Sequence, residues 1–235
     1  MLLNEILQVN YKKSDKPSKI HGVGRSTDNF EKFTNIERKN PKTVVGSGCE
    51  AIVFHSSRPQ NVGTVTKWLR NQRQNSNNNA YIKYLIKCQS INSTYVPRVY
   101  NITQYTRPKG IYEYAIQMEK LPISFVQYIR QYCDDAHLLR SILIQIFSEK
   151  YSEELVSKYC GTKYGLSFIL TEVRNALESN YNVHGNINPQ IISTLDLIHD
   201  LEGKNATLDI HGHNTMVRLT NMGPQLVITD PLLGK

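Results

Sequence analysis

The chain has 235 residues, of which 40% are hydrophobic, and a formal net charge of +8. This composition excludes a disordered or fibrous protein and allows either one large domain or two small ones. The first apolar run is too short for a signal peptide and contains Glu5, and no later segment approaches membrane-spanning length. The four cysteines are far apart, which favours reduced thiols over a disulfide framework or a zinc knuckle. We therefore expect a cytoplasmic protein with no membrane partner.

The positive charge is concentrated in the first half of the chain. No acidic residue lies between Glu50 and Glu113, whereas lysines and arginines recur throughout that stretch. Such a region attracts nucleotide phosphates, nucleic acid or an acidic protein surface, or it forms a solvated basic face. Neither an interleaved aromatic platform nor a helix-turn-helix pattern accompanies the charges, which argues against nucleic acid as the partner.

The first half is predicted to be a small β-rich lobe after an N-terminal extension. Residues 1–42 are polar and lysine-rich, with a short helix expected near residues 2–9. From residue 43 the pattern changes to β-rich runs separated by turns, and one amphipathic helical run follows Asn79, a suitable N-cap. The expected strands are 43–48, 51–56, 62–69, 96–103 and 111–121, and the expected helix is 80–90. Residues 43–121 thus indicate a five-stranded antiparallel sheet with one helix.

The second half, residues 122–235, is predicted to be mostly helical. Apolar residues recur at spacings of three and four over 125–133, 135–159, 165–181 and 189–203. Asn188 followed by Pro189 is typical of a helix start. Three short strands are expected at the end of the chain, over 206–210, 215–219 and 225–230. The fold class is therefore α+β, with a sheet-containing lobe and a helical lobe that carries a short hairpin.

A glycine-containing turn and a strand lysine mark the β-rich lobe. In the sequence VGSGCEAIVF, Gly46, Ser47 and Gly48, at the end of the first expected run, form the turn to the second, and Val53 occupies the place of the valine in a kinase glycine-rich loop. Glycines in such a hairpin let backbone N–H groups approach phosphates closely, although an ordinary hairpin turn has the same composition. Lys67 lies in the third expected strand, where a kinase has the lysine that holds the α and β phosphates.

The last thirty residues contain a second set of polar residues with the spacing of a phosphoryl-transfer site. Asp209 and Asn214 have the D-x-x-x-x-N spacing of a kinase catalytic loop, in which the aspartate receives the proton of the nucleophile and the asparagine holds a metal ion. Asp230 is expected to end the strand over 225–230, where a kinase has its Mg²⁺-chelating aspartate. Carboxylate and amide oxygens suit Mg²⁺.

This order of motifs resembles the protein-kinase-like superfamily, with its bilobal fold. The segment LDIHGHNTMV, with VITDP after it, is similar to the catalytic segment of the early serine/threonine protein kinases of T-seven-type phages. The resemblance implies transfer of phosphate from ATP, with Mg²⁺, to serine or threonine of host proteins, including transcription and RNA-processing proteins, in the host cytoplasm. It also implies that Glu119 and Leu121 offer backbone groups to adenine and that Met118 is the gatekeeper. A secreted bacterial effector kinase has the same pattern.

One departure from the kinase pattern concerns Lys67. Kinases pair this lysine with a glutamate of the following helix, yet residues 80–90 contain no acidic residue. Lys67 therefore needs another partner, for which Glu50 and Asp230 are the candidates.

His211 leaves the class of acceptor open. Small-molecule phosphotransferases, such as those acting on aminoglycosides or choline, have D-x-H-x-x-N, which this sequence matches, but so do the phage enzymes. A zinc site of His211 with His199 and His213 lacks helical spacing and sulfur ligands, so a loop-orienting role for His211 is expected instead. Three functions remain: a protein kinase, a small-molecule phosphotransferase, which a deep acidic pocket in the helical lobe would favour, and a kinase-like binding protein with little activity.

Overall fold

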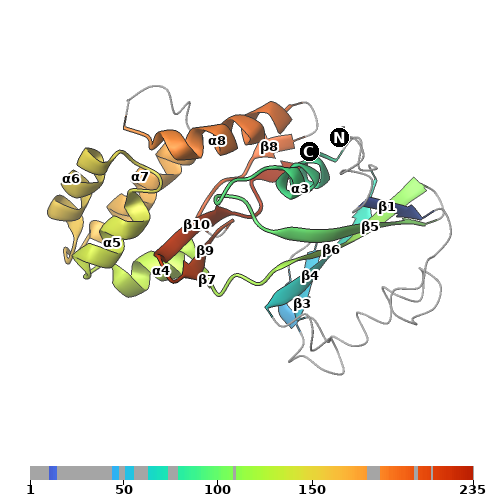
Figure 1. The fold of residues 1–235 in the computed structure, drawn as a ribbon, viewed down its shortest axis with the longest axis horizontal. Helices are drawn as coiled ribbons and strands as arrows, with labels where there is room; N and C mark the ends of the chain where they lie inside the picture. Colours follow the sequence, from blue (N-terminus) through green and yellow to red (C-terminus); the bar gives the residue numbers. More distant parts are fainter. Residues whose placement is uncertain are drawn as a thin grey trace. The chain divides into compact units, whose positions relative to one another are not determined.

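In the computed structural model the protein has an α+β fold, and its chain divides into two compact units. The first unit contains residues 1–91 and 98–120, and the second contains residues 92–97 and 121–235. The structure describes residues 11–14, 44–47, 51–55, 63–73, 79–107, 110–178, 186–203, 206–212 and 214–234. None of the described helices is long and apolar enough to cross a bilayer. Each unit has its own β-structure (Figure 1) and its own buried apolar residues.

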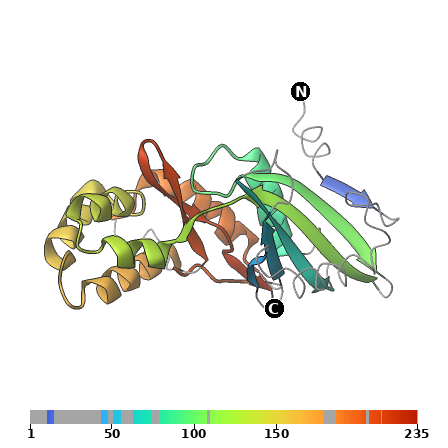
Figure 2. The ribbon, with the colours of Figure 1, turned by 90° about the horizontal axis from the view of Figure 1, so that it is seen from below.

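The first unit is built on a six-stranded sheet. Its strands, in the spatial order β1-β5-β6-β4-β3-β2, are β1 (Tyr11–Ser14), β5 (Val99–Arg107), β6 (Ile111–Glu119), β4 (Thr64–Gln72), β3 (Ala51–His55) and β2 (Val44–Ser47). Strands β2 to β6 pair antiparallel and correspond to the five predicted strands. Strand β1, at one edge in Figure 2, pairs parallel with β5 and corrects the five-stranded prediction. Its short sequence Tyr-Lys-Lys-Ser has no apolar alternation that would indicate a strand. The helix expected near residues 2–9 lies outside the described residues.

Helix α3 (Ala80–Ser90) packs against this sheet through its apolar face. Its N-cap is Asn79, as predicted, because the Asn79 side chain accepts a hydrogen bond of 2.9 Å from the backbone N–H of Ile82. Its buried residues include Tyr81, Tyr84 and Cys88. Burial raises the pKa of the Cys88 thiol to about 12.

The strands of the first unit present two different faces. On one face, Ile52 of β3, Trp68 of β4 and Ala115 of β6 are neighbours in register, and Trp68 stacks on Tyr105 at a centroid distance of 5.3 Å. These residues are buried in one apolar cluster with Phe54. Because side chains alternate along a strand, Lys67 lies on the opposite face from Trp68. Its neighbours in register there are Val53 and Ile116.

The second unit contains five described helices and two small sheets. The helices are α4 (Phe125–Tyr132), α5 (Ala136–Leu143), α6 (Glu149–Tyr159), α7 (Gly165–Glu178) and α8 (Pro189–Leu201). Sheet strands are β7 (Ile123–Ser124), β8 (Ala206–Leu208), β9 (Thr215–Thr220), β10 (Gly223–Ile228) and β11 (Leu232–Gly234). The first small sheet has the order β10-β9-β7, and the second pairs β11 with β8. The predicted hairpin is β9–β10, whereas β7 and β11 are too short to show a periodicity in the sequence.

Capping side chains set the helix starts in the second unit. Asn188 accepts a hydrogen bond from the backbone N–H of Gln190 at 2.9 Å and caps α8, as predicted. The helical run predicted over residues 135–159 is two helices, α5 and α6. Ser148 caps α6, and Phe147 before it forms a β-bridge with Ile187, so the backbone is extended there and the helix restarts. Helices α5, α6 and α7 lie side by side in Figure 1.

Candidate active site

The loop between β8 and β9 holds Asp209 and Asn214 in direct contact. Asp209 follows the last residue of β8, and Asn214 precedes the first residue of β9. The amide nitrogen Nδ2 of Asn214 donates to the backbone oxygen of Asp209 at 2.8 Å and to its carboxylate Oδ2 at 2.7 Å. The predicted pair is therefore brought together, with the asparagine orienting the carboxylate through a charge-assisted hydrogen bond.

Asp230 is brought to the same loop by backbone pairing. Strand β11 pairs with β8, and the N–H of Asp209 donates to the backbone oxygen of Pro231 at 2.8 Å. The backbone oxygen of Asn214 accepts from the N–H groups of Thr229 at 3.0 Å and Asp230 at 3.3 Å. Asp230 was predicted to end its strand, but β10 ends at Ile228 and Asp230 lies in the connection to β11. The backbone of this connection is therefore bonded to the Asp209–Asn214 loop at both of its ends.

His211 contacts the loop through both its backbone and its ring. Its backbone oxygen accepts from the N–H of Asn214 at 2.8 Å and from the hydroxyl of Thr215 at 3.2 Å. Its ring nitrogen Nε2 lies 3.5 Å from Asp209 Oδ1. Both carboxylate oxygens of Asp209 thus have a neighbour within the loop, while more than a third of its side chain stays exposed. Among the residues that the structure describes, no group of three histidines, cysteines or acids has the arrangement of a metal site, and His213 lies outside them.

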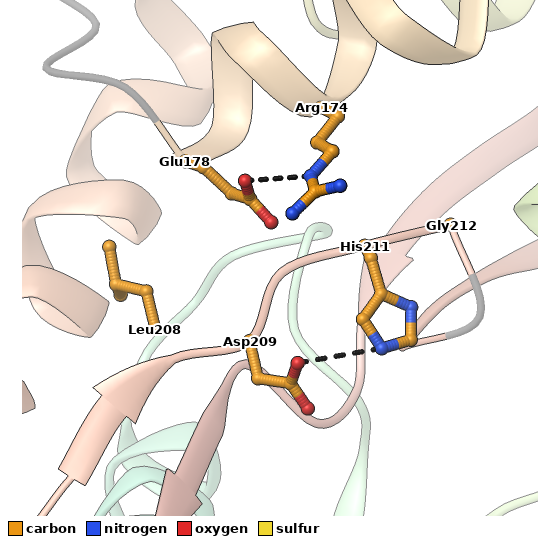
Figure 3. A pocket seen from close by; sticks show the side chains of 6 residues that line it. All are labelled: Arg174, Glu178, Leu208, Asp209, His211 and Gly212. Carbon is orange, nitrogen blue, oxygen red and sulfur yellow. Dashed lines mark hydrogen bonds and ion pairs between the residues drawn. The ribbon is translucent and has the colours of Figure 1, made fainter.

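A pocket of about 460 Å³ opens beside Asp209 (Figure 3). Its lining consists of Arg174, Glu178, Leu208, Asp209, His211 and Gly212. Arg174 Nε donates to Glu178 Oε2 at 2.8 Å across one turn of α7. This hydrogen bond and the charge of Glu178 raise the pKa of Arg174, and Asp209 contributes less to the same shift. Sequence reasoning missed Arg174 and Glu178, because an i, i+4 ion pair is ordinary on a solvated helix face.

An apolar groove of about 250 Å³ adjoins this pocket. It shares Arg174, His211 and Gly212 with the pocket and is otherwise lined mainly by apolar residues of α4 and α7, such as Val126 and Leu170. The backbone oxygen of Gly212 accepts a hydrogen bond of 3.3 Å from the N–H of Val126, which attaches the loop to the start of α4. The loop therefore forms a wall common to a polar pocket and an apolar groove.

Lys67 has an aromatic partner in the first unit. Its Nζ donates to the hydroxyl of Tyr81 at 3.0 Å and lies 4.4 Å from the centre of the Tyr81 ring. Tyr81 is in the first turn of α3, the helix in which the kinase pattern has a glutamate. Of the two candidate partners expected from the sequence, Glu50 lies outside the described residues, and Asp230 belongs to the second unit. Tyr81 thus contributes both a hydrogen bond and a cation–π contact to the ammonium group.

The remaining residues predicted to bind nucleotide are divided between the two units. Gly46 and Ser47 were expected in a turn but are paired residues of β2, and Val53 is opposite Lys67 in β3. Gly48 lies outside the described residues. Glu119 ends β6, and its carboxylate Oε1 accepts from the backbone N–H of Arg98 at 2.8 Å. The N–H of Glu119 donates to the backbone oxygen of Arg98 at 2.9 Å, so this donor is already used within the sheet. Met118 is buried, and Leu121 is a half-buried residue of the second unit.

Comparison with known proteins gives no family for the chain. The sequence matches no protein-family model, and no curated protein matches it at a significant level.

Proposed function

We propose that the protein is an ATP- and Mg²⁺-dependent kinase that transfers the γ-phosphate to serine or threonine hydroxyls of other proteins. The observation that carries the proposal is the assembly of Asp209, Asn214 and Asp230 around one loop in the second unit. Asn214 follows Asp209 by five positions, and Asp230 follows Asn214 by sixteen. Hydrogen bonds from the Asn214 side chain and from the backbone nevertheless hold the three residues together. A loop that only connected two strands would not need a carboxylate held by an amide, with a second aspartate attached to the same backbone.

Asp209 acts as the proton acceptor in this proposal. The acceptor hydroxyl oxygen attacks the γ-phosphorus, the bond from that phosphorus to the oxygen bridging it to the β-phosphate breaks, ADP leaves, and the hydroxyl proton passes to the Asp209 carboxylate. The Asn214 amide fixes Oδ2 of Asp209, and His211 lies beside Oδ1, so the carboxylate has a defined orientation while remaining accessible from the pocket. Positioning of this kind supplies much of the rate in phosphoryl transfer.

Asn214 and Asp230 supply oxygens that fit Mg²⁺. The Asn214 amide turns its Nδ2 toward Asp209, and none of its hydrogen bonds to described residues uses Oδ1. A single amide oxygen with a carboxylate is a normal protein contribution for Mg²⁺, because nucleotide phosphates and water complete the octahedron. When bound, the metal ion would neutralise charge on the transferred phosphate.

Lys67 contributes a cation from the first unit. In the proposal it steadies the α and β phosphates. The other residues of the first unit that bind the nucleotide are Gly46, Ser47, Gly48 and Val53. Glu119 and Leu121 contact the adenine. Tyr81 supports this role, since a hydroxyl and an aromatic face orient Lys67 while leaving its positive charge uncompensated by the tyrosine. Tyr81 thus supplies a contact to Lys67 from α3, the helix in which the kinase pattern has a glutamate.

The resemblance to phage kinases suggests the acceptors. Host proteins, including those of transcription and RNA processing, are the acceptors we propose, with action in the host cytoplasm. A secreted effector kinase would use the same residues for the same reaction.

A small-molecule phosphotransferase is the second candidate, and one observation favours it. The pocket beside Asp209 contains two carboxylates, those of Glu178 and Asp209, which would attract a cationic small molecule. Arg174 in the same pocket is bonded to Glu178 and offsets one of the two charges. Because the pocket is not strongly acidic, a protein acceptor remains the first proposal.

Incubation with ATP labelled at the γ-phosphate, Mg²⁺ and a host-cell lysate tests the proposal. Label that enters lysate proteins with the wild type but not with Asp209→Ala or Lys67→Ala supports a protein kinase. Label that enters only small molecules supports the second candidate. Absence of transfer from the folded wild type would refute both enzymatic functions and leave a kinase-like binding protein.

A further inference from the structure

Arg174 presents hydrogen-bond donors to the pocket beside Asp209. On α7, Ile169, Val173 and Leu177 are buried, whereas Arg174 and Glu178 face the pocket. A guanidinium group has five N–H donors, and in the described part of the chain the Arg174 group forms one hydrogen bond, from Nε to Glu178. Glu178 thereby fixes the orientation of the guanidinium, while the N–H groups of both terminal nitrogens stay available to a ligand. Figure 3 shows the Arg174 guanidinium beside Glu178, above the loop that carries Asp209 and His211.

The pocket lies on one particular side of Asp209. Asp209 and His211 line it, but the metal-binding candidates Asn214 and Asp230 do not. In phosphoryl transfer the attacking and leaving oxygens are roughly in line on opposite sides of the phosphorus. The metal and the leaving phosphates belong on the side of Asn214 and Asp230, so the pocket is where the acceptor hydroxyl would enter.

A guanidinium whose Nε is already hydrogen-bonded can bind an anion through its two terminal nitrogens. Its two terminal nitrogens form a planar fork that matches the two oxygens of a carboxylate or the oxygens of a phosphate. The Arg174 side chain is 64% exposed, so an incoming group reaches it without rearrangement of α7. Glu178 is already engaged with Arg174, which disfavours a cationic group at this end of the pocket.

Resting on the proposed function, we propose that Arg174 selects acceptor segments that carry an acidic side chain next to the accepting hydroxyl. A pocket of about 460 Å³ is wide enough for one or two residues, since extended chain advances by about 3.3–3.6 Å per residue. The acidic residue therefore lies within two positions of the serine or threonine. Arg174 is a specificity-determining residue in this arrangement, and Glu178 is its positioning residue.

A peptide library tests the inference. Peptides from a digested lysate, first treated with phosphatase, are phosphorylated by the wild type, Arg174→Gln or Arg174→Glu, and the sites are mapped by mass spectrometry. The readout is the enrichment of aspartate and glutamate within two positions of the modified residue, relative to all serine and threonine sites. A second library that retains its native phosphates distinguishes a phosphorylated neighbour from aspartate or glutamate.

Arg140→Gln is the matched control, because Arg140 also binds glutamates, Glu149 and Glu153, but does not line the pocket. We expect acidic enrichment of about threefold to fivefold for the wild type and Arg140→Gln, as an exposed charged pair has a modest effect. Arg174→Gln should reduce the enrichment to about one, and Arg174→Glu should replace it with enrichment of lysine and arginine.

The outcomes separate this inference from the proposed function. Transfer by the wild type without acidic enrichment, or with enrichment that persists in Arg174→Gln, overturns the role of Arg174 and leaves the kinase activity standing. Absence of transfer to any peptide or lysate protein refutes the kinase activity and the role of Arg174 with it.

Discussion

Replacing Gly212 with alanine should displace the Asp209–Asn214 loop. A Cβ atom at this position would lie 2.3 Å from Cγ2 of Val126 and 3.6 Å from its Cβ. Carbon atoms normally approach to about 3.5–4.0 Å, so the overlap with Cγ2 is about 1.2–1.7 Å. Val126 is β-branched and lies in the first turn of α4, which restricts its rotation away from the new methyl group. Overpacking of this size destabilises proteins by about 1–3 kcal/mol.

The assay is urea unfolding of four proteins: the wild type, Gly212→Ala, Val126→Ala and the double variant. Because Val126→Ala removes Cγ2, the double variant should be more stable than the sum of the single effects predicts, by about 1 kcal/mol or more. Phosphate transfer should fall in Gly212→Ala and recover in the double variant, since the displaced loop carries Asp209. Additive effects on the free energy of unfolding, within about 0.5 kcal/mol, would refute the close contact between Gly212 and Val126.

Two further predictions concern the site and the core. Asn214→Ala removes two hydrogen bonds to Asp209, one of them to its carboxylate. The free energy of unfolding, measured by urea titration, should fall by about 2 kcal/mol. A loss under about 0.5 kcal/mol would contradict the geometry of the loop. Cys88 should resist alkylation at pH 8 in the folded protein and react after unfolding. Because folding raises the pKa of the Cys88 thiol from 9.0 to about 12, the stability it contributes is fully present below pH 9 and is lost as the pH rises toward 12. Cys88→Ala should therefore reduce the fall in stability between pH 9 and 11, and an unchanged fall would contradict this assignment.

Local patterns in the sequence predicted much of the fold. The amide–carboxylate contact joins residues five positions apart, and the D-x-x-x-x-N spacing alone predicts both members. The Asn79 and Asn188 caps were predictable for the same reason, since a cap acts on the next two or three residues. The alternation of apolar residues likewise indicated strands β3 to β6.

Contacts that depend on long-range pairing were not predictable. A strand was expected where β8 lies, but β11 has three residues, too few to show a period, and its pairing with β8 brings Asp230 to the loop. Tyr81 was not predicted as a partner of Lys67, because the kinase pattern has a carboxylate in this helix, whereas the contact comes from a hydroxyl and an aromatic ring. Arg174 was missed because nothing in the sequence indicates which side of α7 faces Asp209.

The rate of γ-phosphate transfer by Asp209→Asn, relative to the wild type, tests the central claim most directly. The asparagine retains an oxygen that accepts the hydrogen bond from Asn214, so the loop should keep its geometry while losing the proton acceptor. We expect the turnover number to fall by about 10²–10⁴-fold, the usual contribution of a general base, with the free energy of unfolding little changed. Turnover equal to that of the wild type would contradict the role of Asp209 and the assignment of the loop as a phosphate-transfer site.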